Sequence, residues 1–148
     1  MACKLEDLAH HWRLMMATAT ESRLQAKTIS ASLTVNDLQQ SITFFEGLGF
    51  AVSDRWEDQG TLLGVMLQAG DVSIGLSQDD WKKGRDRQKG VGMRLFIETK
   101  QDIDQIASRA RTAGVKLDAE PHDTEWKTRA FEVTEPSGFK ITIGSMTT

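Results

Sequence analysis

The sequence predicts an α+β fold built from two tandem β-α-β-β-β modules behind an N-terminal helix. Strand-like and helix-like hydrophobic periods follow one another in this order twice, and the second set repeats the first after about 65 residues. Residues 1–27 share neither repeat. We therefore expect a helical extension over 1–27 and a single domain over 28–148, composed of modules 28–78 and 91–145.

The N-terminal extension has apolar residues at helical spacing, which predicts one amphipathic helix followed by a short linker. These residues are Leu5, Leu8, Trp12, Met15 and Met16. Cys3, His10 and His11 lie on the same segment, but neighbouring histidines point to different sides of a helix and no fourth ligand is near. We therefore expect a docking helix or a terminal tail, without a metal site.

In the first module, apolar and polar residues alternate over 28–35, which predicts a half-buried strand. Residues 37–50 then place apolar side chains at helical spacing and include Gly49 as a stop signal, which predicts a helix. Three further strands are expected over 51–56, 61–68 and 72–77, with a turn at 69–71.

The second module follows the same order. Residues 92–98 alternate as a strand, and the helical pattern of 101–114 ends at Gly114. Strands are expected over 115–120, 128–134 and 139–144, the last with Phe139, Ile141 and Ile143 on one face and Lys140 and Thr142 on the other. The charged, glycine-punctuated segment 78–90 between the modules reads as a solvated linker.

Composition limits the classes of partner. The net charge of −3 is spread along the chain, so neither nucleic acid nor a membrane surface is expected to bind. The chain has one cysteine and no apolar run of membrane-spanning length, and Lys4, Glu6 and Asp7 stand where a signal peptide would be apolar. We expect a cytoplasmic protein whose partner is a small molecule or another protein.

Two segments have a recognisable pattern: VNDLQQSITFFEGLGF at 35–50 and EPSGFKITI at 135–143. Together with the tandem modules, they resemble the vicinal oxygen chelate superfamily, the group of glyoxalase I, bleomycin and fosfomycin resistance proteins and extradiol dioxygenases. The resemblance covers residues 28–145. It implies a curved mixed sheet with a concave ligand cup, and it leads us to expect a homodimer.

The resemblance also implies where a metal would be bound. In the enzymes of this superfamily, histidines and glutamates from the first and last strands of each module hold a divalent metal. The matching positions here are Ser30, Gly75, Arg94 and Thr142, none of which is a usual ligand. His122 is expected in a loop, so no strand would carry a histidine. We therefore expect no metal and no other cofactor.

The polar faces of the strands predict what lines the cup. They carry Ser30, Ser32, Thr34, Ser73, Gly75, Ser77, Arg94, Phe96, Glu98, Lys140 and Thr142. Small polar groups, one aromatic ring and both charges suit a ligand with polar edges. In the alternative, Arg94 and Glu98 pair with each other in a partly wet groove.

The chain has four tryptophans and no tyrosine. Core packing is the default for a large ring, but EWKTRAFEVTEPSGFKI resembles the stretch of bleomycin-resistance-type proteins whose aromatic residues stack on the drug. The resemblance makes Trp126 and Arg129 ligand-binding candidates, with Trp81 a weaker one. The full predicted set is Ser30, Ser32, Arg94, Phe96, Trp126, Arg129, Lys140 and Thr142.

These observations favour a metal-independent protein that sequesters a small, partly aromatic ligand, and catalysis is not expected. One alternative is a glyoxalase- or dioxygenase-type enzyme with a divergent metal site, in which Glu98 acts as a general base and Arg94 stabilises an oxyanion. A second alternative is a structural dimerisation module whose cup is filled by its own side chains.

Overall fold

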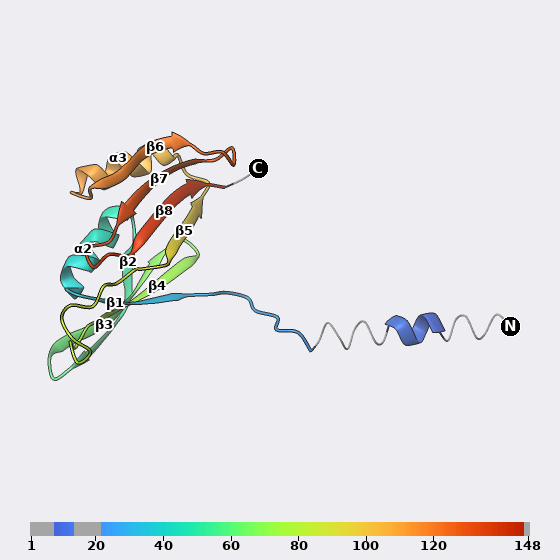
Figure 1. Ribbon diagram of the computed structural model, residues 1–148, viewed down its shortest axis with the longest axis horizontal. Coiled ribbons are helices and arrows are strands. Elements are labelled where there is room, and N and C mark those ends of the chain that lie inside the picture. The colour runs from blue at the N-terminus through green and yellow to red at the C-terminus, as the bar shows by residue number, and fades with distance from the viewer. Residues whose placement is uncertain (1–7, 14–21, 147–148) are drawn as a thin grey trace.

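The computed structural model describes residues 8–13 and 22–146. Residues 8–13 are helical, in agreement with the predicted N-terminal helix, and the predictions for Cys3, Met15 and Met16 lie outside the described residues. Residues 24–30 have no regular structure and run away from the body of the protein (Figure 1). The first strand therefore begins later than expected, at Ala31, and Ile29 is exposed.

The first module consists of one helix and four strands in the predicted order. They are β1 (Ala31–Val35), α2 (Leu38–Leu48), β2 (Ala51–Asp58), β3 (Thr61–Ala69) and β4 (Val72–Gln78). Asp37 caps α2 by accepting the N–H of Gln40 at 3.1 Å, and Gly49 ends it in the left-handed conformation, which costs a glycine little. Gly70 forms the expected turn between β3 and β4 with a positive φ of 57°.

The second module repeats this order. Its elements are β5 (Arg94–Thr99), α3 (Ile103–Thr112), β6 (Leu117–Asp123), β7 (Arg129–Thr134) and β8 (Lys140–Ser145). Asp102 caps α3 as Asp37 caps α2. The prediction that His122 lies in a loop is wrong, because β6 continues through Pro121 to Asp123. β6 is an edge strand with irregular register, where a proline is tolerated.

The strands form two mixed four-stranded sheets, one from each module. The orders are β1-β4-β3-β2 and β5-β8-β7-β6, and the outer pairs β1/β4 and β5/β8 are parallel while the others are antiparallel. Figure 1 shows the second-module sheet in orange and red above the first-module sheet. The α+β fold class and the tandem modules are confirmed.

Each sheet buries one face against helices. In β8, Ile141 and Ile143 are buried while Lys140 is exposed and Thr142 half-buried, as the alternation predicted. The buried faces and the two helices share one apolar core, which includes Phe45 of α2. We call the opposite face of each sheet its open face. Among helices of the described residues, none combines the length and apolar character needed to cross a bilayer.

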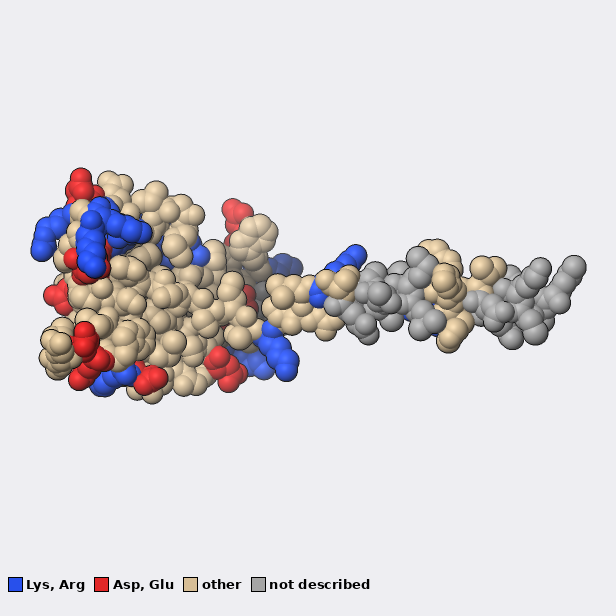
Figure 2. All heavy atoms as spheres, turned by 90° about the horizontal axis from the view of Figure 1, so that it is seen from below, with Lys and Arg blue, Asp and Glu red and all other residues tan. Residues whose placement is uncertain are grey.

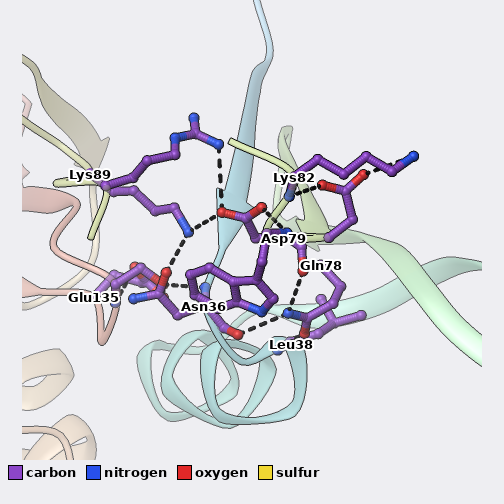
Figure 3. A network of polar contacts seen from close by, with 11 residues as sticks. Asn36, Leu38, Gln78, Asp79, Lys82, Lys89 and Glu135 are labelled. Atoms are coloured by element: carbon purple, nitrogen blue, oxygen red, sulfur yellow. Dashed lines mark hydrogen bonds and ion pairs between the residues drawn. The ribbon is translucent and has the colours of Figure 1, made fainter. Parts of the chain in front are cut away.

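The segment between the modules is bound to the body, so its interpretation as a solvated linker is wrong. Asp79 is only 4% exposed and its Oδ2 lies 2.7 Å from Lys89 Nζ, which also contacts the Asn36 side chain (Figure 3). The Trp81 N–H donates to Asp79 Oδ1 at 2.8 Å, and the Trp81 ring lies 4.6 Å from Lys89 Nζ. This network holds the connection against the start of α2.

Candidate functional site

The open face of the second-module sheet brings together four of the eight predicted ligand-binding residues. Register pairs Arg94 with Lys140 and Phe96 with Thr142 on adjacent parallel strands β5 and β8. Glu98 follows on the same face of β5, opposite Gly144. This group mixes an aromatic ring, a hydroxyl and both charges on neighbouring strands.

Arg94 contacts two neighbouring strands of this sheet. Its Nη1 donates to Thr142 Oγ1 at 3.0 Å and lies 3.4 Å from Glu132 Oε1 of β7. The partner of Arg94 is thus Glu132, which the sequence interpretation missed, and not Glu98, the partner in the alternative interpretation. The alternation over 128–134 could have indicated Glu132. It lies between Phe131 and Val133, which are buried, so its side chain points to the open face.

Two aromatic side chains of the second module are unusually exposed. Phe96 is 73% exposed and Trp126, in the turn between β6 and β7, is 76% exposed. Large rings are normally mostly buried, and exposed apolar groups beside polar ones are typical of interaction surfaces. Core packing is therefore excluded as the role of either ring within this chain.

Arg129, predicted to bind ligand, is paired with two carboxylates. Its Nε and Nη2 lie 2.7 and 2.9 Å from the two carboxylate oxygens of Asp104 on α3, and its Nη1 lies 3.1 Å from Asp123 Oδ1. These hydrogen bonds raise the pKa of Arg129 above its usual value and lower the pKa of Asp104. The guanidinium thereby ties β7 to α3 and holds the base of the turn that carries Trp126.

On the first-module sheet, Ser32 lies on the open face of β1 and Ser30 precedes that strand. Gly75 of β4 is buried beneath neighbours on the same face, since a Cβ there would lie 3.7 Å from Ser32 Oγ and 3.8 Å from Met66 Cε. On the face of the molecule seen in Figure 2, acidic and basic side chains lie near each other around a broad area without charge.

The positions that resemblance assigns to metal ligands do not suit a divalent metal. Arg94 presents a cation there, Gly75 has no side chain, and Ser30 and Thr142 offer neutral hydroxyls. The Thr142 hydroxyl already accepts from Arg94. Within residues 8–13 and 22–146, no three His, Cys, Asp or Glu side chains are grouped as a metal site requires.

A cavity of about 770 Å³ lies elsewhere, between the two modules on the helix side of the sheets. Its walls come from the end of α2, the β3–β4 turn, the end of β5 and one side of α3. Of the predicted site residues, Glu98 alone lines it. The cavity is therefore separate from the surface that carries Arg94, Phe96 and Thr142.

Solved structures with the same fold are numerous, and each is similar at low sequence identity. TioX from Micromonospora sp. ML1 has 16% identity and a TM-score of 0.66, over 81% of this chain and 98% of its own. A superfamily member from Sphaerobacter thermophilus DSM 20745 has 22% identity and a TM-score of 0.63, over 82% and 98%. A bleomycin-binding protein in complex with bleomycin has 15% identity and a TM-score of 0.62, over 82% and 100%.

No curated protein matches the sequence. The family model described as Glyoxalase/Bleomycin resistance protein/Dioxygenase superfamily matches residues 27–143, which spans both modules and most of the chain. The tandem modules and the structural neighbours agree with this match. The chain therefore belongs to the glyoxalase/bleomycin resistance protein/dioxygenase superfamily.

Proposed function

We propose that the protein binds and sequesters a small, partly aromatic molecule without a metal. The observation that carries this proposal is the position of Arg94. The resemblance implies a metal ligand at this position, whereas Arg94 presents a guanidinium that contacts Thr142 and Glu132. An ordered guanidinium with remaining donors binds oxygen atoms of a ligand directly.

The aromatic character of the ligand is argued from Phe96 and Trp126. Phe96 lies two positions after Arg94 on β5 and Trp126 lies in the β6–β7 turn, and burying these exposed rings against a flat ligand would remove apolar area from water. Lys140 and Ser32 would add polar contacts at the margin. The bleomycin-binding neighbour is an example of this fold in complex with a small molecule.

The test is a titration of purified protein with a panel of planar aromatic compounds, followed by calorimetry. Phe96→Ser should weaken the tightest binder about tenfold, because one stacking surface is removed. Trp12→Ala is the matched control, since it removes an exposed ring from the extension and should leave affinity unchanged. Equal affinity of Phe96→Ser and wild type would contradict the proposed site.

The enzymatic alternative makes a different prediction for metal content. Protein purified without chelators should contain far less than one equivalent of transition metal, because the donor set around Arg94 does not suit one. Stoichiometric zinc, nickel, iron or manganese, lost in Thr142→Val, would support a divergent catalytic site instead.

The proposal includes a homodimer. Leu24 and Ile29 on the extended segment 24–30 are almost fully exposed, and Phe96 and Val91 add exposed apolar area on the body. A partner subunit would cover such groups. Light scattering coupled to gel filtration should give twice the mass of 16.5 kDa, and a monomer at micromolar concentration would contradict this part.

A further inference from the structure

Trp56 is seated on the backbone of the neighbouring strand. It lies opposite Gly64 in the β2–β3 ladder, on the open face of the first-module sheet. A Cβ built on Gly64 would lie 2.1 Å from Trp56 Cζ2 and 2.2 Å from Cε2, so the indole covers the place that a side chain would occupy. Any residue larger than glycine at position 64 would push the ring away.

The glycine serves the ring and not the backbone. Gly64 is not among the residues with positive φ, so an alanine would be acceptable to the strand itself. A glycine inside a strand weakens it and often marks close approach of another group. A register shift follows directly after Trp56, between Trp56 and Glu57, and such irregularities re-aim side chains.

One side of the Trp56 indole packs against Gly64, and the residue remains 41% exposed. The strand residues around it on the open face are small or neutral: Ser77 lies opposite Gly64, and Met66 and Gly75 form the next row. Asp54 lies on this face two positions before Trp56 and opposite Met66, and the register shift also places Glu57 on it, opposite Leu62. A flat, exposed ring thus stands between two residues that carry carboxylates.

We propose that Trp56 and Asp54 form a stacking subsite for a planar aromatic cation. The inference rests on the proposed function and names the class of ligand. A tryptophan face attracts cations through its quadrupole more strongly than other rings do, and a carboxylate nearby adds Coulomb attraction. Because the indole is already positioned on Gly64, stacking on it costs little conformational entropy.

The test measures affinity for proflavine, a planar aromatic cation, and for anthracene carboxylate, a planar anion of similar size. Wild-type protein should bind the cation about tenfold more tightly than the anion. Trp56→Ala should weaken proflavine binding about tenfold, and Asp54→Asn should weaken it several-fold and reduce its salt dependence. Trp12→Ala should change neither affinity.

Gly64→Ala provides a second test that keeps the indole but displaces it from its seat. It should reduce proflavine affinity nearly as much as Trp56→Ala does, with circular dichroism confirming the fold. Unchanged proflavine binding in both Trp56→Ala and Gly64→Ala would overturn the subsite, and if Phe96→Ser still weakened binding, the proposed function would stand. Preference for the anion would overturn the ligand class, and no binding of any planar compound would overturn both proposals.

Discussion

The two modules have the same order of elements but different open faces. The first-module sheet presents small or neutral residues, one seated indole and two acidic residues, Asp54 and Glu57. The second-module sheet presents paired charges around Arg94 and an exposed ring, Phe96. Repetition therefore preserves the scaffold, whose buried faces must fill one core, while the open faces are free to diverge.

The turns that close the modules differ in the same way. Between β7 and β8, Glu135 is 1% exposed and accepts the Ser41 hydroxyl of α2 at 2.5 Å and the Ser137 N–H at 2.8 Å. Between β3 and β4, the turn residue Asp71 is exposed and borders the cavity between the modules. One turn thus joins the modules, whereas the other leaves a gap.

Among the variants that disturb the turn joining the modules, Gly90→Ala is expected to lower the stability most. A Cβ at Gly90 would lie 2.3 Å from the Gly138 carbonyl oxygen in the β7–β8 turn. Gly92 has nearly the same positive φ, 77° against 78°, but open space around it. We expect Gly92→Ala to lower the free energy of unfolding by about 1 kcal/mol and Gly90→Ala by about 3 kcal/mol. Urea denaturation measures both, and equal losses would mean that the linker does not press on the turn.

A smaller loss is expected from Glu135→Gln. The amide retains one acceptor oxygen and points an NH₂ group at donors, so it should lower the free energy of unfolding by about 2 kcal/mol. Asp71→Asn is the matched control in the first-module turn and should stay within about 0.5 kcal/mol. If thermal and urea denaturation gave the two variants the same stability, the contrast between the turns would be wrong.

The sequence predicted the scaffold well because local periods encode it. Every strand and both domain helices lie where alternation or helical spacing placed them, with ends shifted by a few residues. The two main errors have local causes. Ile29 continues the alternation of β1 but lies outside the sheet, and the strand predicted over 115–120 continues through Pro121 to Asp123, because an edge strand tolerates proline.

The polar contacts were less predictable because they join distant segments. The alternative interpretation paired Arg94 with Glu98, its neighbour on the same strand, whereas Arg94 contacts Glu132 of β7. Glu135 is bonded to Ser41, 94 positions away in the chain. The sequence did contain a signal for the packing of Trp56, because Gly64 interrupts a strand pattern. Only the register of β2 and β3 shows that Trp56 is the ring that packs on this glycine.

The pH dependence of stability tests the connection between the modules, with a smaller expected effect. The ion pair with Lys89 and the Trp81 N–H lower the pKa of Asp79 below its usual value. Because the folded-state pKa is lowered, ionised Asp79 stabilises the folded protein fully above its unfolded-state pKa of about 3.9. This stabilisation is lost as the pH falls from there through the folded-state pKa. The stability gap between wild type and Asp79→Asn should therefore be full at neutral pH and shrink below about pH 4.

Urea denaturation at a series of pH values checks this expectation, with Asp80→Asn as control. Asp80 is exposed and lies 3.7 Å from Lys82, so its removal should matter little at any pH. A gap for Asp79→Asn that stayed constant down to pH values near 3 would show that the carboxylate acts through packing and not through its charge.

The smallest effect concerns the open faces themselves. Phe96→Ala should change the free energy of unfolding by less than about 0.5 kcal/mol, because the ring touches little of its own chain. Trp56→Ala should cost about 1 kcal/mol, because the indole buries one side on Gly64. Chemical denaturation at protein concentrations low enough to keep both variants monomeric compares their free energies of unfolding directly. A larger loss for Phe96→Ala would mean that its ring is packed in solution, and that the second open face is covered by protein and not held ready for a ligand.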